Sequence, residues 1–392
     1  IMARAFLVVI DSVGIGGAPD AHQFFNGDLP DTGANTVGHI ARDAGLRVAT
    51  LDSLGLGAAV KLASGDAAAG LGIEPTGAWG AATEVSPGKD TPSGHWELAG
   101  VPVPWDWHVF PDADPAFPAE LTALICKLAG TDGILGNRHA SGTAVIEEEG
   151  EAHLKTGWPI CYTAADSVLQ IAAHEDAFGL ERLMKLCKDL APTLHDMKVG
   201  RVIARPFVGE VGAFSRTGNR KDFAIAPPAP TICDYVHDLG RKVYAVGKIG
   251  DIFSMRGIDD LRKGRDAVLM GHLNDLAEEA DDGSFIFANL VEFDSEYGHR
   301  RDPKGYASHL EWFDAALASL LPRLRVDDLL IITADHGNDP TWVGTDHTRE
   351  RVPVLVHGLG AKALGHLAFT DVAASIAAYL DVPYQGEGKS FL

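Results

Sequence analysis

The sequence predicts an α/β fold with a mostly parallel sheet that is covered by helices on both faces. Short apolar runs, such as residues 4–10 and 329–333, are typical of strands that are buried on both sides. These runs alternate with longer segments of helical spacing, for example 304–325. Several apolar runs also end in loops that are rich in glycine, aspartate and histidine, where open α/β sheets bind their ligands.

The chain has 392 residues, which is more than one ordinary hydrophobic core holds. We expect a core formed by residues 1–105 and 226–392, and an inserted α+β domain formed by 106–225. Proline and aromatic residues crowd the start of the insertion, and the linker Pro227-Pro228-Ala229-Pro230 follows its end. Inside the insertion we expect helices at 118–129 and 179–190, a loop-like region at 130–143 and a strand at 199–208.

Composition limits the partners of the chain. Hydrophobic residues make up 46% and charged residues 22%, as in an ordinary soluble globular protein. The formal net charge of -21 argues against nucleic acid or an anionic membrane as a partner, because both require basic faces. No segment has the pattern of a signal peptide or a membrane span, and the four cysteines lack CxxC spacing. We therefore expect a cytoplasmic protein with reduced thiols and no obligate protein partner.

Three of the apolar runs end in or next to an aspartate. Asp11 follows the first run, Asp294 follows the strand expected at 285–293, and Asp335 follows the run at 329–333. Parallel strands point their carboxyl ends to one edge of a sheet, so these carboxylates are expected to converge. Histidines follow two of the three strands, namely His299, His336 and His347. Oxygen and nitrogen ligands without thiolate suit two ions of Mn²⁺ or Zn²⁺.

Each of these residues also has an ordinary interpretation. A single aspartate at a strand end is more often a helix cap, and a single histidine is more often a hydrogen-bonded surface or core residue. The repetition of the same pattern on three strands favours the metal site. Two divalent ions in one site are typical of enzymes that displace a phosphoryl group, so the residues predict phosphoryl transfer to water or to a sugar.

Such a reaction requires a nucleophile, and the loop at residues 87–97 offers two hydroxyl groups. Thr91 and Ser93 stand there among two acids, a lysine and a histidine, between glycine and proline residues. The loop is either a polar surface turn or the segment that presents a hydroxyl to the metals. The pattern alone leaves the choice between Thr91 and Ser93 open.

Seven segments of the sequence, spread over nearly the whole chain, resemble the phosphopentomutases of the alkaline phosphatase superfamily. Four of them lie in the expected core, at 11–16, 88–97, 294–303 and 333–350, and three lie in the insertion, at 140–143, 162–168 and 201–207. The resemblance implies an alkaline-phosphatase-like core with an inserted cap. It also implies the interconversion of ribose 1-phosphate and ribose 5-phosphate, and of the 2-deoxyribose pair.

The resemblance assigns roles to individual residues. It implies one Mn²⁺ held by Asp294, His299 and His347, and a second held by Asp11, Asp335 and His336. Thr91 is expected to carry a phosphate, to donate it to the substrate through a bisphosphate intermediate, and to be charged by a sugar bisphosphate such as glucose 1,6-bisphosphate. The residues expected to contact the sugar and its distal phosphate are Asp166, Arg201, Arg216 and Lys248.

The sequence departs from the pattern of this family in two places. The family often has threonine or methionine after the nucleophile and threonine next, whereas here Pro92 and Ser93 follow Thr91. Pro92 fixes its own φ and biases Thr91 away from the α region, which suits a rigidly presented nucleophile. Ala164 replaces a serine that is common in the family, so one hydrogen bond to the substrate is expected to be absent.

Other functions remain open on the sequence. A metal-dependent phosphatase or phosphodiesterase of the same superfamily would use the same nucleophile and metals, with water as the acceptor. We expect the insertion to exclude water from the site, which favours transfer to a sugar. A sensor that only binds metal or sugar phosphate would have lost the nucleophile or its ligands, and all seven residues are present.

Overall fold

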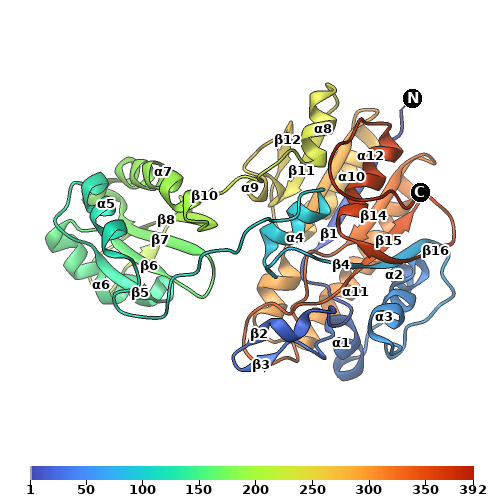
Figure 1. Cartoon of the computed structure of the whole chain (residues 1–392), viewed down its shortest axis with the longest axis horizontal. Coiled ribbons are helices and arrows are strands. Elements are labelled where there is room, and N and C mark those ends of the chain that lie inside the picture. The colour runs from blue at the N-terminus through green and yellow to red at the C-terminus, as the bar shows by residue number, and fades with distance from the viewer. Residues whose placement is uncertain (1) are drawn as a thin grey trace. The chain divides into compact units, whose positions relative to one another are not determined.

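The structure is a computed structural model that describes residues 2–392. It divides into two compact units (Figure 1). The first unit is formed by the chain up to Pro104 together with Pro227–Leu392, and the second by Trp105–Ala226. These bounds lie one residue from the predicted ones. Within the described residues, none of the helices combines the length and the apolarity that crossing a membrane would require.

The first unit is built on an eight-stranded sheet. Its strands are ordered β12 (Asp260–Arg262), β11 (Val243–Gly247), β13 (Phe285–Leu290), β1 (Ala5–Ile10), β14 (Leu329–Thr333), β15 (Val352–His357), β4 (Ala78–Thr83) and β16 (Lys362–Ala368). Neighbouring strands are parallel except for the two pairs that include β15. The prediction of a mostly parallel sheet is therefore confirmed.

The apolar runs form the centre of this sheet. Val8 of β1 is aligned with Ala288 of β13 on one side and with Ile332 of β14 on the other. Every residue of these three strands is buried. Strands without an exposed face must be covered on both sides, which explains why their sequences show no polar alternation. The three strands are parallel, so the residues that follow them meet at one edge.

The helices of the first unit cover the sheet in two groups. Helix α11 (Pro303–Leu320) contacts α1, α2 and α10, whereas α12 (Thr370–Leu380) contacts α4 and α8. The other helices are α1 (Thr36–Ala44), α2 (Ala49–Leu54), α3 (Leu56–Ser64), α4 (Thr91–Leu98), α8 (Ile232–Asp238), α9 (Ile249–Ile252) and α10 (Asp266–Glu279). Two short strands, β2 (Phe25–Asn26) and β3 (Leu29–Pro30), form a hairpin.

The second unit has its own sheet and its own core. Its strands are ordered β10 (Lys221–Ala224), β8 (Arg201–Val208), β7 (Val168–His174), β6 (Ile160–Thr163) and β5 (Leu135–His139), and β9 (Ser215–Arg216) also pairs with β8. Helices α5 (Ala119–Ala129) and α7 (Leu180–Asp196) pack on one face of the sheet, in the same cluster as Leu169 and Ile171. Helix α6 (Gly142–Thr156) packs on the other face with Ala172.

Two local expectations are wrong. The region from Gly130 to residue 143 is not only a loop, because it contains β5 and the start of α6. Every residue of β5 is only half-buried, so this edge strand lacks an apolar run. The strand expected at 285–293 ends at Leu290, and Asp294 lies in a short π-helix, Phe293–Gly298. The apolar run continues past the strand because Phe293 is buried in that helix.

Candidate metal centre

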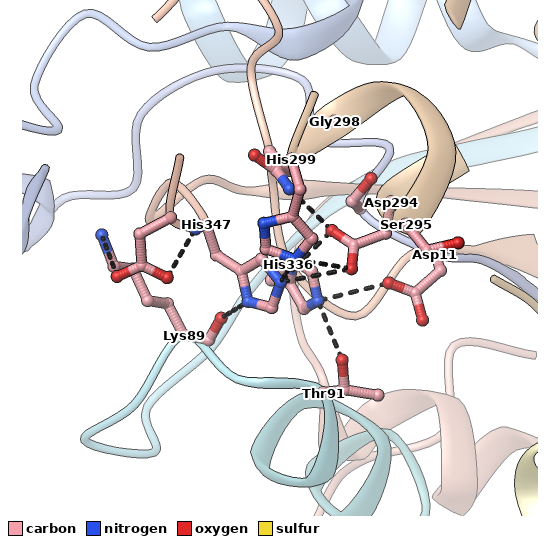
Figure 2. Close-up of polar contacts among 12 residues, drawn as sticks. Asp11, Lys89, Thr91, Asp294, Ser295, Gly298, His299, His336 and His347 are labelled. Carbon is pink, nitrogen blue, oxygen red and sulfur yellow. Dashed lines mark hydrogen bonds and ion pairs between the residues drawn. The ribbon is translucent and has the colours of Figure 1, made fainter. Parts of the chain in front are cut away.

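The six predicted ligands lie together beyond the carboxyl ends of β1, β13 and β14. Figure 2 shows Asp11, Asp294, His299, His336 and His347 among them. Asp11 directly follows β1, and Asp335 lies two residues beyond β14. Asp294 lies in the π-helix after β13, four residues beyond the strand end. The short contacts divide the six residues into two clusters, as described below.

The first cluster contains Asp11, Asp335 and His336, which are all buried. His336 Nε2 lies 3.3 Å from Asp11 Oδ1 and 3.1 Å from Asp335 Oδ2. Neither of these carboxylate oxygens has a hydrogen-bond partner. The other oxygen of each carboxylate is held, since Asn289 Nδ2 donates to Asp11 Oδ2 (2.7 Å) and the Ser12 N–H donates to Asp335 Oδ1 (3.0 Å). Each carboxylate is therefore fixed by one oxygen and leaves the other available to a cation.

The second cluster contains Asp294, His299 and His347. His347 Nε2 lies 3.1 Å from His299 Nε2 and 3.2 Å from Asp294 Oδ1. His299 Nε2 lies 3.2 Å from Asp294 Oδ2. Asn338 Nδ2 donates to Asp294 Oδ1 (2.7 Å) and fixes this carboxylate. The rings of His336 and His347 are stacked with their centroids 3.7 Å apart, so the two clusters adjoin.

The three histidines are held in the same way. The Nδ1 atom of each lies 2.6–2.9 Å from a backbone carbonyl oxygen, which identifies Nδ1 as the protonated nitrogen. The carbonyls belong to Gly337 for His336, Lys89 for His347 and Thr345 for His299. The Nε2 lone pair of each ring is thereby directed at the acidic cluster. Metal-binding histidines in proteins are commonly fixed by such a bond from the other nitrogen.

The electrostatics of the site favour a cation. Burial raises the pKa of Asp11, and the nearby carboxylates of Asp335 and Asp294 raise it further. Burial alone would lower the pKa of His336, but Asp335 and Asp11 outweigh it and raise that pKa well above its ordinary value. Three carboxylates in a buried place repel one another unless positive charge lies between them. The oxygen and nitrogen donors, with unpaired oxygens on two of the carboxylates, fit divalent cations such as Mn²⁺ or Zn²⁺.

The Thr91 hydroxyl lies beside the first cluster. Thr91 is the first residue of α4, and its Oγ1 lies 3.3 Å from His336 Nε2 (Figure 2). Ser93 is fully buried, and its hydroxyl donates to Asp90 Oδ1 (2.8 Å). Pro92 occupies the second position of the helix, where its missing N–H costs no intrahelical bond. The expected bias of Thr91 away from the α region therefore does not prevent the helix from beginning at Thr91.

The other four predicted residues are distributed over both units. Lys248 is exposed and follows β11 in the first unit. The other three belong to the second unit, where Asp166 is exposed in the turn between β6 and β7 and Arg201 begins β8, with its Nη1 3.4 Å from Asp222 Oδ2. Arg216 of β9 lines a cavity of about 160 Å³ whose other charged side chains are Arg205 and Arg220. Their roles in substrate binding stay predictions.

The sequence did not single out the residues that hold the ligands in place. Asn338 supports Asp294, and Arg301 donates both to Asn338 and to the carbonyl oxygens of Gly298 and Asp346. Asn289 could have been found, because a polar amide within the apolar run of β13 is unusual and calls for a buried partner. Arg301 carried no comparable signal, since most arginines in such loops are solvated.

Comparisons with known proteins place the chain in a family. It matches the model of the metalloenzyme superfamily over residues 3–384. A protein of Rhizobium leguminosarum bv. trifolii named phosphopentomutase is 50% identical over 412 residues, and one of Methylorubrum extorquens with the same name is 52% identical over 410 residues. Both alignments cover 100% of this chain and 100% of the relative.

A solved structure of a protein from Pyrococcus horikoshii is similar in fold. Its TM-score is 0.51 at 13% sequence identity, and the match covers 99% of this chain and 100% of that one. The full-length identity to named relatives confirms the resemblance that the sequence motifs indicated. The chain therefore belongs to the metalloenzyme superfamily and, within it, to the phosphopentomutase family of enzymes.

Proposed function

We propose that the chain interconverts ribose 1-phosphate and ribose 5-phosphate, and the corresponding 2-deoxyribose phosphates, through a phosphothreonine. The observation that carries this proposal is the position of the Thr91 hydroxyl. It lies at the start of a helix, 3.3 Å from His336 Nε2, beside six side chains that fit two divalent cations. The name of the relatives that match the whole chain supports the same reaction.

Two Mn²⁺ ions fit the site best as one ion held by Asp11, Asp335 and His336 and another held by Asp294, His299 and His347. Ions in such a pair supply the positive charge that stabilises the attacking and leaving oxygens of a phosphoryl displacement. Asn289, Ser12 and Asn338 orient the carboxylates, as the bonds described above indicate. The backbone carbonyls that hold the three imidazoles orient the remaining ligands.

Thr91 is the proposed carrier of the phosphoryl group. A sugar bisphosphate such as glucose 1,6-bisphosphate transfers one phosphoryl group to Oγ1 and leaves as the monophosphate. The phosphothreonine ester then breaks as a bond forms to a free hydroxyl of the pentose phosphate, which yields a pentose bisphosphate. Transfer of the other phosphoryl group back to Thr91 completes the isomerisation. The ester lies at the positive end of α4, which stabilises its negative charge.

Substrate binding requires local positive charge, because the chain as a whole carries a formal net charge of -21. We propose that Arg201, Arg216 and Lys248 bind the distal phosphate and that Asp166 binds the sugar. The cavity beside Arg216 supports an anionic ligand there, since Arg205 and Arg220 also line it. The cytoplasm is the proposed compartment, which agrees with the four free cysteines.

The alternative is a phosphatase or phosphodiesterase of the same superfamily, with water as the acceptor. The two functions differ in their products from ribose 5-phosphate. We would incubate the enzyme with Mn²⁺, a trace of glucose 1,6-bisphosphate and ribose 5-phosphate, and follow the products by phosphorus NMR. The proposal predicts ribose 1-phosphate. Free phosphate without ribose 1-phosphate would establish the hydrolase instead.

A further inference from the structure

A fourth buried histidine, His95, adjoins the first metal cluster. It lies one turn after Thr91 on α4 and is fully buried. Its Nδ1 atom lies 2.9 Å from the backbone oxygen of Thr91 and 3.2 Å from Asp335 Oδ2. Its Nε2 atom lies 3.2 Å from Asn289 Nδ2. His95 therefore contacts the nucleophile's own backbone, one carboxylate of the cluster and the amide that holds Asp11.

The protons in this network can be assigned. Asn289 Nδ2 donates to Asp11 Oδ2 (2.7 Å). If the amide of Asn289 were flipped, its Oδ1 would face Asp11 Oδ2, and neither of these two oxygens could donate a hydrogen bond. The group that faces His95 Nε2 is thus an NH₂, which can only donate. His95 Nε2 must accept this bond, so the ring proton is on Nδ1, which donates to the Thr91 carbonyl and also faces Asp335 Oδ2.

This arrangement distinguishes His95 from the three predicted histidine ligands. All four rings are protonated at Nδ1, but the Nε2 lone pairs of His299, His336 and His347 face the carboxylates. The Nε2 lone pair of His95 is instead occupied by Asn289, although atoms of His95, Asp11 and Asp335 lie within 4.8 Å of one another. In this geometry His95 has no lone pair left for an ion.

The packing of α4 supports a role for this network. A Cβ atom on Gly94 would lie 2.1 Å from the backbone oxygen of Asp335, so the helix touches the chain of a predicted ligand. The Oδ1 atom of Asn289 is buried without a hydrogen-bond partner. A buried unpaired oxygen destabilises the fold, so the structural contribution of the Asn289 side chain comes from the two bonds that its NH₂ group donates.

We propose that His95, oriented by Asn289, is a positioning residue that fixes the first turn of α4, and with it the Thr91 hydroxyl, against the carboxylates of Asp11 and Asp335. This inference rests on the proposed function, because it assigns a purpose to the placement of Thr91. Loss of the network moves the nucleophile relative to the cluster but removes none of the six ligands.

Two substitutions distinguish the contribution of Nδ1 of His95 from that of Nε2. In His95→Asn the side-chain NH₂ can take the place of Nδ1 and still donate to the Thr91 carbonyl. In His95→Gln the longer side chain reaches Asn289 but leaves that carbonyl without its side-chain donor. The full-length enzyme would be measured for bound Mn²⁺, for kcat and KM with ribose 5-phosphate, and for the rate at which glucose 1,6-bisphosphate phosphorylates Thr91.

We expect both variants to bind two Mn²⁺ ions. His95→Gln should lower kcat about 10- to 100-fold with little change in KM, as loss of a supporting contact at a metal site typically does. His95→Asn should recover most of this loss. Asn289→Leu removes the bond to His95 and also the bond that holds Asp11 Oδ2, so it should lower kcat and weaken Mn²⁺ binding as well.

His153 offers a matched control in the second unit. It is buried, its Nδ1 lies 2.6 Å from the Trp158 carbonyl oxygen, and its Nε2 accepts the backbone N–H of His174 at 3.0 Å. His153→Asn keeps a donor for the Trp158 carbonyl and breaks the Nε2 bond, as His95→Asn does, but far from Thr91 in the sequence. It should lower stability and leave kcat and Mn²⁺ binding unchanged.

Two results would overturn the inference. If His95→Asn loses one Mn²⁺ ion while His153→Asn keeps both, His95 is a ligand. If His95→Gln retains the wild-type kcat and phosphorylation rate, His95 does not position Thr91. Failure of the proposed function is recognised separately, because the wild-type enzyme would then release phosphate without forming ribose 1-phosphate. The same comparison of variants would in that case be made on the rate of phosphate release.

Discussion

At the scale of single residues, the role of a side chain depends on what holds its second polar atom. His336, His95 and His153 are all buried rings with the proton on Nδ1. The Nε2 atom of His336 faces two unpaired carboxylate oxygens. That of His95 faces an amide NH₂ group, and that of His153 faces a backbone N–H. The first arrangement fits a metal ligand, the second a positioning residue and the third a structural residue.

His153 gives a prediction for the dependence of stability on pH. Burial lowers the pKa of His153 below its ordinary value of 6.5, and His174 and Arg182 lower it further. Below about pH 6.5 the unfolded chain binds a proton that the folded chain does not. The stability that the neutral ring contributes is therefore present above this pH and is lost as the pH falls towards the depressed pKa.

Urea unfolding at about pH 7.5 and about pH 5.5 would measure this effect. The wild-type protein should lose more unfolding free energy between the two pH values than His153→Asn does. The variant itself should be less stable at the higher pH by about 1 kcal/mol for each lost hydrogen bond. Equal losses in the two proteins on acidification would show that His153 does not contribute to acid sensitivity.

The sequence singled out the six candidate ligands but not the residues that hold them in place, and the reason is physical. Asp11 and Asp335 stand out because an acid follows an apolar run. His95 of α4 and Asn289 of β13 contact each other only in the folded structure, because these two elements are far apart in the sequence. The sequence alone therefore does not indicate this contact. The pattern of residues left Thr91 and Ser93 as alternatives, the family resemblance favoured Thr91, and the bond from the Ser93 hydroxyl to Asp90 favours Thr91 as well.

At the scale of secondary structure elements, the site depends on the close approach of α4 to the end of β14. The helix can lie there because residue 94 has no side chain, and a Cβ would meet the Asp335 backbone at 2.1 Å. Backbone atoms cannot move away as a flexible side chain can. Gly94→Ala should therefore displace α4 and Thr91, with an activity loss of about 100-fold or more.

A matched substitution tests whether the contact, and not the loss of a helical glycine, causes this effect. Gly271 lies inside α10, and a Cβ there would have nothing within 4 Å. Gly271→Ala should raise the unfolding free energy by about 0.5–1 kcal/mol and leave turnover unchanged. Wild-type turnover in Gly94→Ala would contradict the close packing of α4 on Asp335.

The elements that the sequence predicted best are those at the centre of the sheet. Strands β1 and β14 are buried at every position, so their apolar runs are unbroken. The edge strands β5 and β16 are half-buried or exposed, and their sequences contain glycine, lysine or histidine. Edge strands need no apolar run, because one side of their backbone pairs with no neighbour. They could not be recognised from hydrophobic patterning.

At the scale of the whole molecule, the acidic charge and the metal centre are linked. The formal net charge of -21 includes three carboxylates that are buried within a few ångströms of one another. Bound cations stabilise the folded state by mass action, because the unfolded chain does not bring these ligands together. The stability of the first unit should therefore depend on the metal.

Removal of the metal gives the corresponding prediction. Scanning calorimetry after treatment with a chelator should show a lower Tm than with added Mn²⁺, and Tm should rise with the Mn²⁺ concentration. An excess of about 100-fold over the Kd corresponds to about 3 kcal/mol for each site. His347→Ala, which lacks one ligand, should respond less. A Tm that is the same with chelator and with Mn²⁺ would argue against a metal centre at these residues.

The central claim is that Thr91 carries the phosphoryl group beside a two-metal site, and intact-mass analysis tests it most directly. The wild-type enzyme, Thr91→Ala and Ser93→Ala would each be incubated with Mn²⁺ and glucose 1,6-bisphosphate and then weighed. We predict that the wild-type enzyme and Ser93→Ala gain the mass of one phosphoryl group, and that Thr91→Ala gains none. A phosphoryl group that persists in Thr91→Ala and is lost in Ser93→Ala would contradict the claim.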